Sequence, residues 1–237
     1  MTQILTKQDH PYFWQFEQSC FDDISEKYFT AEYWQANNAV IGQESGRGTT
    51  WFVQHGDAQL VLRHYLRGGM MRHINHDNYL LSTYNKTRSV AEFKVLHALL
   101  KKNLPVPTPA AAQVIKRGLF YKADLLTHKI PDAQDLIQVL RQAQSTTFYQ
   151  QLGKMIATFH RQGVFHADLN IQNILQDKEG KFWLIDFDRA RIITPQKKWQ
   201  EATLNRLKRS FEKEKVRFDI KWSEPDWTAL MQGYQSK

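Results

Sequence analysis

The sequence lacks the residues and runs that mark several classes of protein. Its 237 residues include one cysteine, Cys20, which excludes an internal disulfide and a cysteine-based metal site and favours a reducing compartment. No apolar run approaches the roughly 18 residues that a membrane-spanning helix needs. The N-terminus has no basic start followed by an apolar stretch, so no export signal is predicted. We therefore expect neither a membrane-spanning helix nor a secreted domain held together by disulfides.

The composition that is present is that of an ordinary folded protein. Hydrophobic residues make up 42% and charged residues 24% of the chain, which does not support disorder or a fibrous repeat. The 32 Lys and Arg exceed the 24 Asp and Glu, which gives a net charge of +8. Such an excess favours a partner that carries phosphate or carboxylate groups, without naming it.

The first half of the chain is predicted to be rich in strands. Apolar and polar residues alternate over 40–66, with turns expected at 44–48 and 55–57. Two further strands are expected over 111–118 and 120–127. Between the strands over 40–66 and those that start at 111, apolar residues recur at three- and four-residue spacing over 88–100, which predicts an amphipathic helix.

The second half is predicted to be rich in helices. Leu152, Met155, Ile156 and Phe159 share one face of an expected helix that Gly163 ends. Together the halves predict an α+β protein with two lobes, a strand-rich N-lobe over 1–127 and a helix-rich C-lobe over 128–237. Small-molecule sites tend to lie between such lobes.

A cluster of polar residues in the second half carries the chemistry. Asp177 and Gly180 bound a short turn, so a hairpin is expected with Asn173 and Asp186 at its open end. At about 3.3 Å per residue, their offset in register is only about 7 Å. An amide oxygen and a carboxylate at that separation can share Mg²⁺, which substrate phosphates usually complete. Asp168, five residues before Asn173, can accept a proton from an attacking hydroxyl.

These residues resemble a known superfamily. The spacing H-x-D-x-x-x-x-N, from His166 to Asn173, resembles the catalytic loop of protein-kinase-like phosphotransferases, and the D-F-D segment that begins at Asp186 resembles their D-F-G. The resemblance implies a bilobal kinase-like fold that uses ATP. It also implies Asp168 as catalytic base, with Asn173 and Asp186 holding Mg²⁺ on the phosphates. His166 is predicted to be structural, with its imidazole bonded to backbone near the D-F-D segment.

Upstream segments extend the resemblance. The family's glycine-rich loop, strand-borne cation and pairing carboxylate correspond here to Gly46, Arg47, Gly48 and Thr49, to Arg63, and to Glu92. The sequence departs from the pattern in four places: the third loop glycine is missing, Arg63 stands in place of lysine, Ala167 replaces the catalytic-loop arginine, and Asp188 replaces the last glycine of D-F-G. Arginine is not equivalent to lysine, although its planar fork can hold phosphate and a carboxylate at once.

Motifs along nearly the whole chain resemble a narrower family. They are R-H-Y-L-R-G-G from Arg63, R-S-x-A-E-F from Arg88, L-P-V-P from Leu104, H-A-D-L-N from His166, L-I-D-F-D from Leu184 and L-N-R-L-K-R-S-F-E from Leu204. Together they resemble the 3-deoxy-D-manno-octulosonic acid (Kdo) kinase family of Gram-negative lipopolysaccharide synthesis. The resemblance implies transfer of the γ-phosphate of ATP to a hydroxyl, expected to be the 4-hydroxyl, of Kdo on the lipid A precursor.

Two basic segments suggest how the protein binds this glycolipid or the membrane that contains it. Arg67 and Arg72 flank a Gly-Gly pair and are expected to bind the carboxylate of Kdo or a lipid A phosphate, unless the segment is only a solvated loop. Residues 197–221 hold nine basic and four acidic residues. This tail is either a packed terminal helix or a peripheral attachment to anionic lipid on the cytoplasmic side of the inner membrane. The aromatic-rich N-terminus is expected to be core.

Several alternatives stay open. Another kinase-like enzyme would act on a heptose, an aminoglycoside or a protein, although a peptide-docking platform has little room here. A scaffold that binds nucleotide without catalysis would explain the altered glycine loop and Arg63. A nucleic-acid binder is disfavoured, because the basic residues are not organised with stacking aromatics. The sequence indicates no obligate protein partner.

Overall fold

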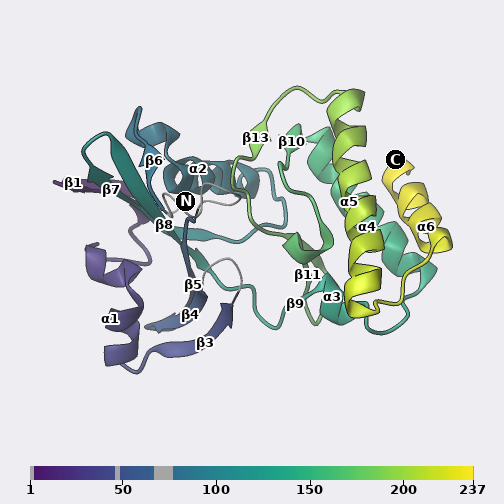
Figure 1. Ribbon diagram of the computed structural model, residues 1–237, viewed down its shortest axis with the longest axis horizontal. Coiled ribbons are helices and arrows are strands. Elements are labelled where there is room, and N and C mark those ends of the chain that lie inside the picture. Colours follow the sequence, from purple (N-terminus) through teal and green to yellow (C-terminus); the bar gives the residue numbers. More distant parts are fainter. Residues whose placement is uncertain (1–2, 46–48, 67–76, 237) are drawn as a thin grey trace. The chain divides into compact units, whose positions relative to one another are not determined.

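The computed structural model describes residues 3–45, 49–66 and 77–236. The chain divides into two compact units (Figure 1). The first comprises Met1–Ala98 and Pro107–Lys129, and the second Leu99–Val106 and Ile130–Lys237. The predicted boundary between 127 and 128 stays a prediction, and the assignment of Leu99–Val106 to the second unit was not anticipated.

The first unit is built on an antiparallel sheet, drawn in purple to teal in Figure 1. Its strands are β1 (Ile4–Asp9), β2 (Tyr12–Glu17), β3 (Val40–Ser45), β4 (Thr49–His55), β5 (Ala58–His64), β7 (Pro109–Arg117) and β8 (Phe120–His128). They lie in the order β1-β2-β7-β8-β5-β4-β3, and the short β6 (Tyr79–Leu80) pairs with β8. The strands expected over 40–66, 111–118 and 120–127 are confirmed, whereas the hairpin of β1 and β2 was not predicted.

The helices of the first unit are α1 (Ala31–Ala36) and most of α2 (Arg88–Leu100), with 3₁₀ turns η1 (Glu26–Phe29) and η3 (Tyr84–Lys86). The bounds of α2 are those that the apolar spacing predicts. Val90, Phe93 and Leu96 are buried along one face of this helix. Glu92 lies on the same helix and is also buried, with 3% of its surface exposed.

The aromatic residues of the N-terminal segment form a core, as predicted. Trp14, Phe16, Phe21, Phe29 and Trp34 are all buried. They belong to one cluster with side chains from the sheet, including Val53, Leu60, Leu62 and Leu126. Burying such rings removes a large apolar area from water, so this cluster is a main source of stability for the first unit.

The second unit contains four helices and short strands among its described residues. The helices are α3 (Leu136–Val139), α4 (Thr146–Arg161), α5 (Lys197–Phe218) and α6 (Glu224–Gln235), and η4 (Ile171–Asn173) is a 3₁₀ turn. Strands β9 (Gln134–Asp135), β11 (Ile174–Gln176) and β12 (Phe182–Leu184) form one small sheet, and β10 (Val164–Phe165) pairs with β13 (Arg191–Ile192).

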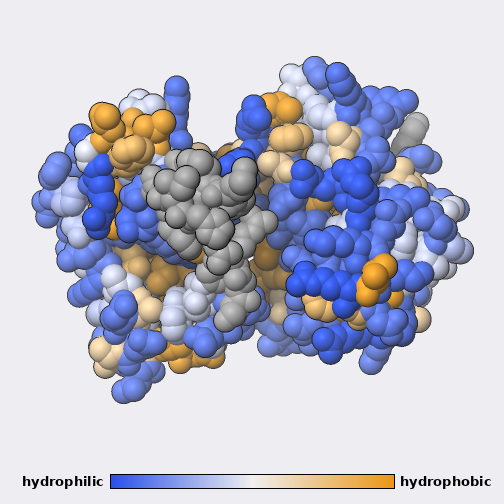
Figure 2. Space-filling model, viewed as in Figure 1, coloured by the Kyte–Doolittle hydropathy of each residue, from blue (hydrophilic) through white to orange (hydrophobic). Residues whose placement is uncertain are grey.

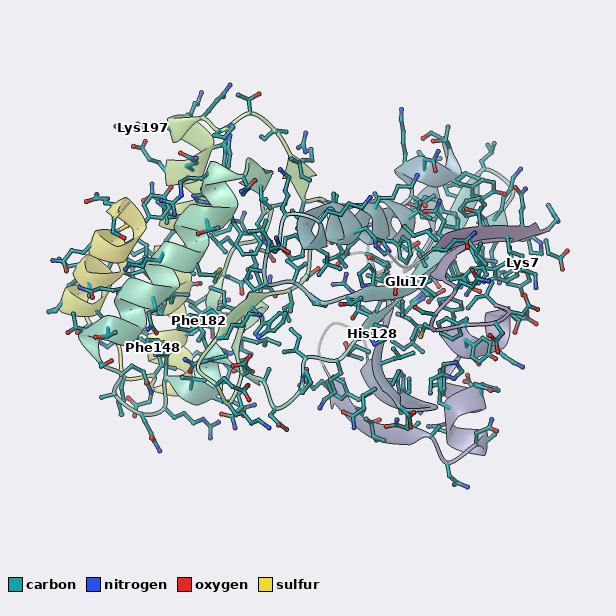
Figure 3. The ribbon with its side chains drawn as sticks, turned by 180° about the vertical axis from the view of Figure 1, so that it is seen from behind. Lys7, Glu17, His128, Phe148, Phe182 and Lys197 are labelled. Carbon is teal, nitrogen blue, oxygen red and sulfur yellow. The ribbon has the colours of Figure 1, made fainter. Side chains whose placement is uncertain are left out.

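Helix α4 packs against α6 in this unit. Leu152, Ile156 and Phe159 are buried as predicted, while Met155 is partly buried. Gly163 has a φ of +75°, so it adopts the left-handed conformation typical of a residue that ends a helix. At the other end of α4, Phe148 lies against Phe182 of β12 with ring centroids 5.0 Å apart (Figure 3). These contacts attach the hairpin of β11 and β12 to α4.

Helix α5 is the predicted basic tail, and one side of it is packed. Leu204, Leu207 and Phe211 are buried, and the ring of Phe211 stacks on Trp222. The surface over α5 that is visible in Figure 2 is mostly hydrophilic. Among the described residues, no helix is both long and apolar enough to cross a membrane.

Helices α4 and α6 meet through a pair of glycines, which gives a stability prediction. A Cβ atom on Gly233 would lie 2.0 Å from the carbonyl oxygen of Gln150, and one on Gly153 would lie 2.0 Å from that of Leu230. Backbone atoms cannot yield as a flexible side chain can. We therefore expect Gly233→Ala to lower the free energy of unfolding by at least about 2 kcal/mol. Chemical denaturation measures this, with Gln151→Ala on the exposed side of α4 as the control; equal stability of the two variants would contradict the prediction.

Candidate active site

The hairpin of β11 and β12 brings two predicted site residues to the same end. Ile174 pairs with Leu184, so Asn173 and Ile185 stand opposite each other just beyond the strands. The backbone N–H of Ile185 donates to the carbonyl of Asn173 over 2.9 Å. Asp186 is the next residue. The turn at the other end is closed by the Asp177 carboxylate, which accepts from the N–H of Lys181 over 2.9 Å.

His166 connects the loop before this hairpin to the segment after it. Its Nε2–H donates to the carbonyl of Ile185 over 3.0 Å, and its Nδ1 accepts from the backbone N–H of Asp168 over 3.2 Å. The predicted structural role is confirmed. Burial lowers the pKa of His166, although Asp186 and Asp168 both lie close enough to oppose that shift. The imidazole is therefore neutral and bonds on both sides.

The backbone of Asp168 is fixed by neutral side chains. Its carbonyl accepts from Asn173 Nδ2 over 2.9 Å and from Asn170 Nδ2 over 3.0 Å. Asn170 also caps η4, since its Oδ1 accepts from the N–H groups of Gln172 and Asn173. Because Nδ2 of Asn173 is used in this way, Oδ1 is the atom of that amide which is oriented as an acceptor.

Asp186 has an unusual backbone. Its φ of +61° lies in the left-handed region, as does the φ of +62° at Arg189 three residues later. Such residues other than glycine cost about 1 to 3 kcal/mol each and cluster at functional sites. The sequence predicts that Asp168, Asn173 and Asp186 act together. In the second unit, Asp168 and Asn173 are joined by hydrogen bonds to each other and to Ile185, the residue next to Asp186.

Sequence reasoning missed Arg206, which contacts the predicted catalytic base. Its Nη1 lies 2.7 Å from Oδ1 of Asp168, and both side chains are about half exposed, at 49% and 47%. Arg206 lies on α5, 38 residues away along the chain. The only signal in the sequence is the basic motif from Leu204, which does not show which carboxylate it meets.

The first unit brings Arg63 of β5 and Glu92 of α2 together. Arg63 Nη2 lies 2.5 Å from Glu92 Oε2, and the two side chains are 27% and 3% exposed. Tyr65 is a further member that the sequence did not indicate. Its hydroxyl donates to Glu92 Oε2 over 2.5 Å, and its ring lies under the guanidinium groups of Arg63 and Arg88. Burial, followed by the charge of Glu92, raises the pKa of Tyr65 well above its usual value, so Tyr65 remains a donor.

Of the remaining predicted site residues, the structure describes only Thr49. Thr49 begins β4 and is exposed. Gly46, Arg47, Gly48, Arg67 and Arg72 lie outside the described residues. Their predicted contacts with nucleotide and acceptor stay predictions.

A second buried histidine gives the fold a pH dependence. His160 lies between the hydroxyls of Tyr234 and Thr203, at 2.8 and 3.1 Å, and burial lowers its pKa to about 4. An unfolded histidine titrates near pH 6.5, so between these values the unfolded state binds more protons. The contribution of His160 to the free energy of unfolding is present above about pH 6.5 and is lost as the pH falls toward 4. Chemical denaturation at pH 7 and at pH 4.5 measures how much of the free energy of unfolding is lost between these values. We expect His160→Gln to lose less than the wild type; identical losses would contradict this.

Comparison with known proteins is consistent with this arrangement. A family model described as "Lipopolysaccharide kinase (Kdo/WaaP) family" matches residues 31–234. Proteins named 3-deoxy-D-manno-octulosonic acid kinase are similar throughout. The one from Vibrio parahaemolyticus is 45% identical over 216 residues, 91% of this chain and 90% of that protein. The one from Haemophilus influenzae strain 86-028NP is 43% identical over 238 residues, 96% of this chain and 98% of that protein.

The α+β fold, with its antiparallel sheet and helix-rich unit, is therefore kinase-like. Such a protein is a phosphotransferase, and membership of a kinase family implies ATP as the phosphate donor. The chain belongs to the lipopolysaccharide kinase (Kdo/WaaP) family.

Proposed function

We propose that this protein transfers the γ-phosphate of ATP to the 4-hydroxyl of Kdo on the lipid A precursor, in the synthesis of the lipopolysaccharide core. The supporting observation is the hydrogen-bonded grouping of Asp168, Asn173 and Ile185, the residue directly before Asp186 and the D-F-D segment. The names of relatives such as that from Vibrio vulnificus strain CMCP6, 46% identical over 212 residues, supply the acceptor class.

Asn173 and Asp186 are the residues proposed to hold Mg²⁺. The described residues include no group of three or more His, Cys, Asp and Glu that could bind a metal. Mg²⁺ in phosphotransferases is usually held by one or two protein side chains, with substrate phosphates and water as the other ligands. The amide of Asn173 presents Oδ1, because Nδ2 donates to the carbonyl of Asp168. The pair therefore fits the ion, which when bound would neutralise charge on the phosphates.

Asp168 is proposed to act on the acceptor. Its Oδ1 is held by Arg206, so Oδ2 is the atom that takes the proton of the sugar hydroxyl. The sugar oxygen then forms a bond to the γ-phosphorus while the bond from that phosphorus to the bridging oxygen breaks, and ADP leaves with that oxygen. The backbone contacts of Asp168 hold the carboxylate in place, which is the main contribution the chain makes in such reactions.

Arg63 and Glu92 are proposed to act on the nucleotide. Arg63, more than a quarter exposed, would bind ATP phosphates, while buried Glu92 holds its other side. The glycine-rich segment that begins at Gly46 would cover the phosphates, through Gly46, Arg47, Gly48 and Thr49. Both assignments concern the first unit and rest on the family pattern together with the ion pair.

The position of Tyr65 gives a test of the nucleotide site. Tyr65→Phe removes a hydrogen bond to the buried carboxylate of Glu92, so we expect a loss of about 1 to 3 kcal/mol in the free energy of unfolding. The KM for ATP should rise several-fold because Arg63 loses its support, while the KM for the acceptor is unchanged. Steady-state kinetics with each substrate varied measures this, with Tyr12→Phe as the control. A Tyr65→Phe enzyme with wild-type KM for ATP would contradict the role.

Mass spectrometry tests the proposed activity. Purified Kdo-bearing lipid A precursor is incubated with the protein, ATP and Mg²⁺, and fragment ions locate any added phosphate. The proposal expects a gain of one phosphate on the Kdo unit, and two-dimensional NMR of the product then assigns the hydroxyl. Phosphorylation of a heptose or an aminoglycoside but not of Kdo would contradict it. Tight binding of Mg-ATP without transfer would favour the non-catalytic alternative.

Peripheral contact with an anionic membrane surface, on the cytoplasmic side of the inner membrane, is part of the proposal. Arg209 and Lys213 are exposed on α5, and Val216 next to them is 90% exposed. Each basic residue near an anionic surface contributes about 1 kcal/mol. Lys208 is a poor site for a test because it pairs with Glu224 over 2.9 Å, whereas Lys213 makes only a longer contact of 3.6 Å, with Glu214. The affinity for anionic vesicles, measured by co-sedimentation, should fall about tenfold or more in Arg209→Glu/Lys213→Glu. Binding that changes neither with salt nor in this double variant would contradict membrane contact.

A further inference from the structure

Arg206 occupies a position that stability does not explain. Its ion pair with Asp168 is about half exposed on both sides. Exposed ion pairs contribute little to folding, because water screens them and two side chains lose freedom. A cation held beside the predicted base is instead well placed to meet a group on the acceptor, since the acceptor hydroxyl must approach the same carboxylate.

The helix that carries Arg206 is fixed against the catalytic loop. Arg206, Ser210 and Glu214 lie on one face of α5 at intervals of four residues. Ser210 Oγ accepts from the N–H of Ile171, and Glu214 Oε1 accepts from Gln172 Nε2, both in η4. Leu207, on the next position of the helix, is fully buried. The place from which Arg206 extends is therefore set by the same 3₁₀ turn that ends at Asn173.

The acceptor class supplies an anion at the right place, and this step rests on the proposed function. An octulosonic acid carries a carboxylate at its first carbon, and the deoxy carbon leaves the 4-hydroxyl as the nearest ring hydroxyl to it. The two groups are therefore only a few covalent bonds apart. A sugar that presents its 4-hydroxyl to Asp168 would bring its carboxylate to the neighbourhood of that residue's partner. We propose that Arg206 binds the carboxylate of the acceptor sugar acid and so selects an acidic sugar over a neutral one.

The guanidinium of Arg206 keeps a carboxylate partner when the sugar acid binds. Arg206 presents several N–H donors in one plane, so it can donate to a second carboxylate while still bonded to Asp168, or move from Asp168 to the substrate. In either case the guanidinium remains paired with a carboxylate. As Oδ1 of Asp168 is the atom that Arg206 contacts, binding of the sugar carboxylate leaves the carboxylate of Asp168 directed at the hydroxyl.

Two acceptors and three variants test this assignment. The acceptors are the Kdo-bearing lipid A precursor and the same glycolipid with the Kdo carboxylate converted to a carboxamide. Loss of a hydrogen-bonded ion pair should reduce kcat/KM of the wild type on the carboxamide by about 10- to 100-fold. Arg206→Gln should show a similar loss on the native acceptor, mainly in acceptor KM, and little further loss on the carboxamide. Arg206→Lys should recover part of the activity.

The control is Arg161→Ala, since that guanidinium contacts the carbonyl of Ser236, just after α6, and not the site. Its kinetics should match the wild type, and thermal unfolding checks that every variant is folded. Equal losses on both acceptors in Arg206→Gln, or no loss at all, would overturn the assignment, because Arg206 would then only position Asp168 or do nothing. Failure of the wild type to phosphorylate the native acceptor is a different result, which would overturn the proposed function and this assignment with it.

Discussion

Asp168→Asn is expected to lower kcat by about a hundred- to ten-thousandfold while the dissociation constant for Mg-ATP stays near that of the wild type. Asparagine keeps the shape of the side chain but cannot take up the proton of the sugar hydroxyl. The backbone contacts that hold the loop come from His166, Asn170 and Asn173, so they survive the substitution. Rapid-quench measurement of a single turnover, with nucleotide binding followed separately by calorimetry, tests both parts.

Asp219→Asn is the matched control for this experiment. Asp219 is an exposed carboxylate of the same unit that pairs with Lys221 over 2.6 Å, so the change in charge is the same. The control should retain wild-type turnover. If Asp168→Asn also retained it, Asp168 would not be the base.

Asp186→Ala should cause the second large effect, with a different signature. We expect transfer to fall by at least about a thousandfold, because the metal ion contributes several kcal/mol of charge stabilisation. Unlike Asp168→Asn, this variant should also bind Mg-ATP much more weakly, while binding of ATP without metal changes little. Titration of ATP affinity against Mg²⁺ concentration in both variants separates the two roles. Equal Mg²⁺ dependence in Asp186→Ala and in the wild type would contradict the assignment of this residue as a ligand.

The elements that sequence reasoning predicted well are those with a strong local signal. The helix over 88–100 and the hairpin around Asp177 have clear periodicity and turn chemistry, and both are confirmed. The hairpin alone was enough to place Asn173 and Asp186 at a common end. The structural role of His166 was also predicted, as an imidazole bonded to backbone near the D-F-D segment, and its bond to the carbonyl of Ile185 confirms it.

The contacts that were missed all join distant parts of the chain. Arg206 reaches Asp168 from α5, 38 residues further along the chain, and the sequence gives only a run of basic residues around it. Tyr65 reads as one more alternating residue of a strand, and its link to Glu92 depends on how α2 packs on the sheet. The β1–β2 hairpin has a polar outer strand, which gives no strong signal for burial on one face. Such pairings are set by tertiary packing, which local patterns do not encode.

Among the described residues, the side chains that bond to the backbone of Asp168 are all uncharged. A neutral imidazole and two amides hold its backbone, so added salt has no charge to screen in these contacts and acts instead on exposed pairs such as that of Arg206 with Asp168. Changes of rate with ionic strength can then be assigned to ligand association and to the Arg206–Asp168 pair, and not to loss of the backbone contacts of the loop.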